Sequence, residues 1–187
     1  MTPIVLGRDP WDKEAIQRDL YVGGLWEFQP MTGNFAFAGI DMALWDLCGK
    51  ACGQPLYRLF GGALNDEIDY FYFLRQASAE DMAAQGRDGI ARGYSVFYLK
   101  VGIDRMAEEA MLEALRQAIG KDAKIRIDVN QAWSVPDALR ILADWHARFD
   151  IDFVEAPVPI DPLENMLELK RPGLPGLCVN EGLWREA

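Results

Sequence analysis

From about residue 66 onward, short apolar runs alternate with longer amphipathic stretches, and this alternation constrains the fold more than any other feature of the sequence. The runs are rich in β-branched and aromatic residues, while in the stretches between them apolar residues recur every three to four positions. We expect strands at residues 68–74, 95–101, 125–129, 151–155 and 177–181. A strand followed by a helix, repeated about four times, is typical of parallel β/α units. The sequence therefore predicts an α/β fold with a parallel sheet, closed as a barrel or open and doubly wound.

The first third of the chain has a different pattern. Residues 34–52 are apolar on almost every side, which predicts a helix covered on more than one side. Shorter helices are expected at residues 11–20 and 55–60, and no segment before about residue 65 is typical of a strand. We therefore predict two domains, a helical region at residues 1–65 and the β/α region at residues 66–187.

Composition excludes several classes of function. The chain has 19 Lys and Arg against 29 Asp and Glu, a net charge of −10, so phosphate backbones and anionic lipid surfaces should repel it. No apolar run approaches the roughly 20 residues of a membrane span, and the first residues lack the layout of a secretory signal. The three cysteines are expected as buried free thiols. We predict a cytoplasmic protein that binds neither nucleic acid nor membrane.

Four of the expected strands end in an ionisable residue. Lys100, Asp128, Glu155 and Glu181 follow one another at intervals of 28, 27 and 26 residues. Because one β/α unit moves the chain sideways by one strand and returns it to the same level, residues one unit apart should lie side by side. In parallel β/α folds the rim at the carboxyl ends of the strands is where active sites form.

Three carboxylates that converge without arginine partners repel one another unless a cation lies between them. An all-oxygen ligand set suits Mg²⁺, with Mn²⁺ as a substitute, and does not suit zinc. We therefore expect Asp128, Glu155 and Glu181 to bind this metal. Taken singly, each of the three is more typical of a solvated carboxylate at a loop, and only their common phase beside a lysine favours the metal site.

Lys100 is the candidate general base, and the alternative is a lysine that extends from the strand end into solvent. Tyr98 lies two residues earlier, should point the same way, and is the second candidate catalytic residue. Asn130 shares a face with Asp128 if the strand continues that far, where it would orient a ligand or contact substrate. It is equally typical of a turn. Trp133 is expected as a packing residue of the loop.

Five segments together resemble the mandelate racemase and muconate lactonizing branch of the enolase superfamily. They are AFAGIDMALWDLCGKACGQPLYRLFGG at 36–62, YLKVG at 98–102, DVNQAW at 128–133, VEAPVP at 154–159 and NEGLW at 180–184. The resemblance implies an α+β capping domain and a modified (β/α)-barrel whose third, fourth and fifth strands each give a carboxylate to Mg²⁺. Those carboxylates match Asp128, Glu155 and Glu181. Lys100 matches the second lysine of the family's Lys-x-Lys pair, and Tyr98 stands in place of the first.

The resemblance implies a partial (β/α)-barrel, with about five of eight units at residues 66–187, preceded at residues 1–65 by the helical remainder of a capping domain. The implied reaction is Mg²⁺-dependent abstraction of the proton α to a carboxylate, through a metal-stabilised enediolate. We expect an acid-sugar dehydratase or a racemase that acts on a small hydroxy-carboxylate and forms a homo-oligomer. The alternatives are a cycloisomerase or epimerase of the same superfamily, and a truncated remnant without catalytic activity.

Overall fold

The structure is a computed structural model that describes residues 2–24 and 30–183. The chain divides into two compact units, Met1–Ile68 and Asp69–Ala187. The boundary predicted from the sequence, after residue 65, lies close to this division. Trp184, the last residue of the NEGLW segment, lies outside the described residues.

The first unit is helical. Its elements are α1 (Thr2–Val5), α2 (Lys13–Gly24), α3 (Pro30–Cys52) and α4 (Leu56–Leu59). A small core of Ile16 and Leu20 from α2 and of Phe37 and Leu44 from α3 holds the two longer helices together. No helix within the described ranges is long and apolar enough to cross a membrane.

Two expectations for the first unit are wrong. The helix at residues 34–52 was expected to be covered on more than one side, but Met42 and Leu47 of α3 are exposed. All three cysteines are free, as expected, but only Cys48 is buried. Cys52 is exposed and Cys178, in the second unit, is partly exposed.

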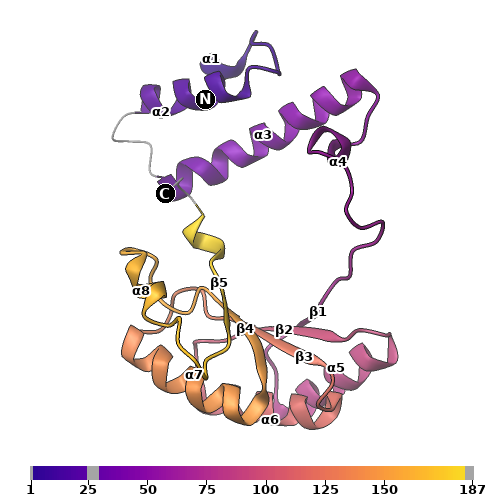
Figure 1. The fold of residues 1–187 in the computed structure, drawn as a ribbon, viewed down its shortest axis with the longest axis vertical. Helices are drawn as coiled ribbons and strands as arrows, with labels where there is room; N and C mark the ends of the chain where they lie inside the picture. Colours follow the sequence, from indigo (N-terminus) through magenta and orange to yellow (C-terminus); the bar gives the residue numbers. More distant parts are fainter. Residues whose placement is uncertain (1, 25–29, 184–187) are drawn as a thin grey trace. The chain divides into compact units, whose positions relative to one another are not determined.

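The second unit contains a five-stranded sheet. Its strands are β1 (Tyr72–Leu74), β2 (Val96–Lys100), β3 (Lys124–Asp128), β4 (Ile151–Glu155) and β5 (Gly176–Cys178). They lie in the order β1-β2-β3-β4-β5, and every neighbouring pair is parallel. The connecting helices are α5 (Ala79–Ala91), α6 (Arg105–Ile119), α7 (Val135–Phe149) and the short α8 (Glu164–Leu167). Helices α5, α6 and α7 cover one face of the sheet (Figure 1), which confirms the predicted parallel α/β fold.

The first and last strands are shorter than predicted. Ile68 and Tyr70 are each 80% exposed, and pairing with β2 begins only at Tyr72. At the other end, Asn180 has a φ of +24°, which is outside the strand region, and residues Asn180–Gly182 form a 3₁₀-helix, η2. Consequently β5 ends at Cys178, and the expected strand at residues 177–181 is wrong in its second half.

Local signals in the sequence set the helix ends. Ser78, Asp104 and Ser134 cap α5, α6 and α7, and each side chain accepts hydrogen bonds from backbone N–H groups of the first turn. Gly120 ends α6 in a conformation with a φ of +74°, which glycine adopts without strain. These residues are local sequence signals for the starts of the three covering helices and for the end of α6.

The core lies between the sheet and these helices. Leu99 and Ile127 of the strands and Leu142 and Trp145 of α7 are all 0% exposed. Trp133 packs edge-on against Trp145, with ring centroids 5.5 Å apart, which confirms its predicted role as a packing residue.

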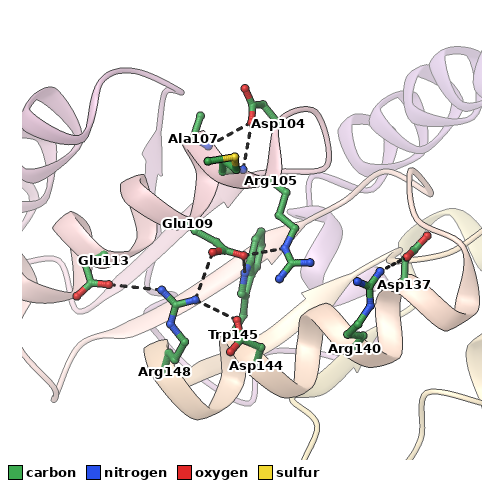
Figure 2. Close-up of polar contacts among 11 residues, drawn as sticks. Asp104, Arg105, Ala107, Glu109, Glu113, Asp137, Arg140, Asp144, Trp145 and Arg148 are labelled. Atoms are coloured by element: carbon green, nitrogen blue, oxygen red, sulfur yellow. Dashed lines mark hydrogen bonds and ion pairs between the residues drawn. The ribbon is translucent and has the colours of Figure 1, made fainter.

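Where α6 and α7 meet on the outside, charged side chains form a network (Figure 2). The Arg148 guanidinium contacts Glu109 at 3.3 Å and Asp144 at 3.0 Å, and Arg105 contacts Glu109 at 2.7 Å. The Trp145 indole N–H also donates to Glu109, at 3.2 Å. The hydrogen bond from Arg105, followed by those from Trp145 and Arg148, holds the pKa of the Glu109 carboxyl below its usual value despite partial burial. The network ties the two helices together on the side away from the sheet.

Candidate metal and active site

Parallel register places three of the predicted residues side by side. Lys100 pairs with Asp128, and Asp128 pairs with Glu155, at the carboxyl ends of β2, β3 and β4. The predicted row along one rim is therefore present for these three. The next partner of Glu155 is Cys178 of β5, and Glu181 lies beyond that strand in η2.

Tyr98 links two of the carboxylates. Its hydroxyl oxygen lies 2.9 Å from Asp128 Oδ2 and 2.8 Å from Glu155 Oε2, which confirms that Tyr98 points toward the rim. Burial, together with the hydrogen bonds to Glu155 and Asp128, raises the pKa of the Tyr98 phenol far above its usual value, so the phenol keeps its proton. A phenol has only one proton and donates to one carboxylate at a time. The second oxygen–oxygen contact therefore needs another proton or a nearby cation.

Lys100 contacts the Asp128 carboxylate as well. Its Nζ is 2.6 Å from Asp128 Oδ2 and 2.6 Å from Asn130 Oδ1. Asp128 is 1% exposed, whereas the Lys100 side chain is 50% exposed. The amine is thus anchored at the rim on a buried acid while part of the side chain stays exposed to solvent.

Two asparagines complete the hydrogen-bonded rim. The Asn130 amide Nδ2 donates to Glu181 Oε1 at 3.0 Å, and its backbone N–H donates to Asp128 Oδ1 at 2.9 Å. Asn180 Nδ2 donates to Glu155 Oε1 at 2.6 Å. Asn130 occupies a turn with a φ of +46°, as one of the two interpretations expected, and β3 ends before it at Asp128. Its side chain contacts Lys100 and Glu181, while a role in orienting a ligand or contacting substrate stays a prediction. Asn180 was missed by sequence reasoning, although its position directly before Glu181 was a usable signal.

Backbone strain is concentrated at this rim. Five non-glycine residues among those described have positive φ, and four of them follow β3, β4 or β5: Asn130, Gln131, Ala156 and Asn180. The fifth, Asp150, is the C-cap of α7. Such conformations cost energy and collect at functional sites, where the surrounding structure holds them in place.

The donor chemistry of the rim fits a hard divalent cation, but the carboxylates do not converge on one point in this arrangement. Asp128, Glu155 and Glu181 offer only oxygen ligands, and Glu181 Oε2 is buried without a hydrogen-bond partner. Across residues 2–24 and 30–183, no three His, Cys, Asp or Glu side chains are grouped closely enough to hold a metal ion. The three acids are instead connected through Tyr98 and Asn130. Direct binding of one ion therefore requires these side chains to turn away from their present hydrogen bonds.

Comparison with known proteins supports the fold and the family together. Residues 81–185 match the family model described as enolase C-terminal domain-like, and residues 1–61 match that of the mandelate racemase and muconate lactonizing enzyme N-terminal domain. The chain belongs to the mandelate racemase and muconate lactonizing enzyme family of the enolase superfamily. The members it matches include racemases, epimerases, dehydratases and cycloisomerases.

Three similar proteins illustrate the range. The chain is 34% identical to the N-succinyl-L-Arg/Lys racemase of Bacillus cereus over 98% of its own length and 48% of the racemase. It is 34% identical to the cis-3-hydroxy-L-proline dehydratase of Roseibium aggregatum, over 76% of this chain and 37% of that enzyme. A crystal structure of the dipeptide epimerase of Enterococcus faecalis, complexed with Mg and the dipeptide L-Leu-L-Tyr, aligns with a TM-score of 0.74 and 31% identity. That alignment covers 89% of this chain and 45% of the epimerase. The chain thus spans less than half the length of these relatives.

Proposed function

We propose that this rim is the metal-binding and base-carrying part of an enzyme that removes the proton α to a carboxylate. The observation that carries the proposal is the row of Lys100, Asp128 and Glu155 on adjacent strands, with the amine 2.6 Å from the first carboxylate. The two units fit the proposal as parts of a capping domain (residues 1–65) and of a (β/α)-barrel (residues 66–187). A homo-oligomeric state and a cytoplasmic location stay predictions.

Asp128, Glu155 and Glu181 are the proposed ligands of Mg²⁺, or of Mn²⁺ in its place. Their oxygen-only chemistry and the unpartnered Glu181 Oε2 support this assignment. The Mg reported with the E. faecalis epimerase gives further support from a relative. When bound, the ion supplies positive charge that offsets the charge developing on the substrate carboxylate.

The residues of the chain supply the remaining chemistry. Lys100 is the group that takes the proton from the substrate α-carbon, and its half-exposed side chain leaves one side of the amine open for that contact. A positioned base of this kind contributes about 10²–10⁴-fold to the rate. Tyr98 stays protonated and links Asp128 to Glu155 as long as no ion is bound between them. Asn130 orients the Lys100 amine from the other side.

The favoured reaction is racemisation or epimerisation of an N-acylated amino acid. An N-succinyl amino acid racemase and two kinds of dipeptide epimerase are among the relatives, and in each named substrate the nitrogen of an amino acid carries an acyl group. A dehydratase that acts on a hydroxy-acid is the second candidate, and the hydroxyproline dehydratase favours it. Both reactions begin with loss of an α-proton, so one assay addresses both.

The test is exchange of the substrate α-proton with deuterium, followed by NMR in D₂O with Mg²⁺ and with N-succinyl-L-lysine, L-Ala-L-Glu or a hydroxy-acid. We expect the α-proton signal to disappear with the wild-type chain and to persist with Lys100→Ala. Lys124→Ala is the matched control, because Lys124 begins β3 and pairs with Asp152 at 3.4 Å. Equal exchange by Lys100→Ala and wild type would refute Lys100 as the base. An inert wild-type chain that still binds Mg²⁺ would favour the remnant without catalytic activity.

A further inference from the structure

We propose that Glu108 is a positioning residue that holds Lys100 and the Asn130 loop in their working arrangement, an inference that rests on the function proposed above. Glu108 lies on α6, outside the rim, and is one of two buried charged residues among those described. The other is Asp128, the partner of Lys100. A buried carboxylate is costly unless it is well hydrogen-bonded, so its contacts identify what it does.

The Glu108 carboxylate closes the loop that follows Lys100. Its Oε1 accepts the backbone N–H groups of Gly102 at 2.8 Å, Ile103 at 2.8 Å and Asp104 at 3.3 Å. The Gln76 side chain also donates to this oxygen, at 3.4 Å. Successive N–H groups that point at one anion form a concave anion site, and here the anion comes from the chain itself. Within the described residues, Glu108 has no Lys or Arg partner, so the loop backbone is its main partner.

Two connections lead from Glu108 to the rim. Gln76 Nε2 donates to the backbone carbonyl of Lys100 at 3.0 Å, so the amide that contacts Glu108 also fixes the end of β2. Gly102, with a φ of +108°, lies so close to the next loop that a Cβ there would be 2.9 Å from Ala132 Cβ. The loop that Glu108 holds is therefore pressed against the loop that carries Asn130. The Glu108 carboxylate is thus connected to the backbone of Lys100 through Gln76 and to the Asn130 loop through Gly102.

Capping of α6 does not account for Glu108. The Asp104 side chain already caps this helix, accepting from the N–H groups of Met106 at 3.1 Å and Ala107 at 3.2 Å. Glu108 bonds instead to N–H groups that precede the helix. Its contacts are thus with the loop, which makes a role in loop placement more specific than a role in helix stability.

The experiment compares three variants of the chain by NMR, with lysine side chains labelled with ¹³C at Cε and the Lys100 signal assigned from Lys100→Arg. Glu108→Ala removes the acceptor, whereas Glu108→Gln keeps one carbonyl oxygen for the loop N–H groups. Glu113→Ala is the control, since Glu113 is on the same helix and its side chain is 55% exposed. We expect the Lys100 signal to shift and α-proton exchange to slow about tenfold or more in Glu108→Ala only. Acetate added to Glu108→Ala should partly restore both readouts by filling the anion site.

An unchanged Lys100 signal in a folded Glu108→Ala chain would overturn the proposal. If Glu108→Ala does not fold, Gln76→Ala decides, because it cuts the link from Glu108 to the Lys100 carbonyl and leaves the loop N–H groups bonded to Glu108. An unchanged signal there overturns the proposal equally. The NMR readout does not depend on catalysis. A wild-type chain without α-proton exchange would therefore refute the proposed function while the Lys100 signal still decides the role of Glu108.

Discussion

The helix-covered face of the sheet in the second unit and the rim at the carboxyl ends of its strands are built in opposite ways. On the face covered by α5, α6 and α7, Leu99, Ile127 and Trp145 are 0% exposed and make apolar contacts. At the rim, ionisable residues of three adjacent strands meet, and the Tyr98 hydroxyl lies within hydrogen-bond distance of two carboxylates. The covered face removes apolar area from water, which stabilises the fold, whereas the rim brings like charges together, which does not.

Within this one sheet, the residues that stabilise the fold are therefore different from the residues proposed for function. Strained backbone follows the strands at the rim, at residues such as Asn130 and Ala156, and the strands beneath carry the packing. Sites whose local arrangement opposes folding are retained for function and depend on the rest of the domain for support. Substitutions on the covered face should therefore change the free energy of unfolding, and substitutions at the rim should change ligand binding and proton exchange.

The largest expected effect is on the covered face. Trp145→Ala removes a large side chain that is 0% exposed, and we expect it to lower the free energy of unfolding by about 3–5 kcal/mol. Chemical denaturation measures this change, with Trp11→Ala as a control because Trp11 is 49% exposed. A loss below about 1 kcal/mol would show that the covered face does not carry the stability.

The next largest effect on stability is expected at Gly102, in the loop between β2 and α6. Gly102→Ala puts a Cβ 2.9 Å from Ala132 Cβ on a backbone with a φ of +108°, so we expect a loss of about 1–3 kcal/mol. Gly120→Ala is the matched control, since Gly120 also has positive φ but no atom within 4 Å of the added Cβ. Denaturation of both variants isolates the contact, and equal losses would contradict it.

A smaller effect concerns the helix network of Figure 2 and its pH dependence. The hydrogen bond from Arg105 lowers the pKa of Glu109 in the folded state, so ionised Glu109 stabilises the fold above its ordinary pKa of 4.5. That contribution is lost as pH falls through the lower, folded pKa. Glu109→Gln should cost about 0.5–1 kcal/mol at pH 7 and progressively less below pH 4.5. A cost that stays constant from pH 7 to acid pH would rule out this electrostatic origin.

The smallest effect on stability is expected at the rim. Glu181→Gln removes a charge whose Oε2 is buried without a partner, so the free energy of unfolding should stay within about 0.5 kcal/mol of wild type or rise slightly. Chemical denaturation without added metal measures this. A loss above about 1 kcal/mol would mean that Glu181 serves the fold and not a ligand.

Much of the second unit follows from local sequence patterns. Ser78 and Ser134, each followed three residues later by an acid, predict the starts of α5 and α7, and periodic apolar residues predict their buried sides. The row of Lys100, Asp128 and Glu155 is also predictable, because equal spacing and parallel pairing place them at one level. These features depend on nearest neighbours along the chain or across the sheet.

The remaining features depend on contacts that spacing does not encode. The position of Glu181 follows from the backbone turn at Asn180, which replaces the second half of the expected strand. The direction of Tyr98 was predictable from strand alternation, but its contact with two carboxylates depends on the separation of three strands. Glu108 had one available signal, its position four residues after the Asp104 cap, but nothing local shows that it turns back to the loop.

The most direct test of the metal-binding rim is calorimetric titration of the chain with Mg²⁺. We compare wild type with Glu155→Gln and with Glu113→Gln, the latter altering an exposed acid on α6. We expect one Mg²⁺ site in wild type and in Glu113→Gln, and an affinity at least about tenfold lower in Glu155→Gln. Equal Mg²⁺ affinity in all three proteins, or no binding to wild type, would contradict a shared divalent cation at this rim.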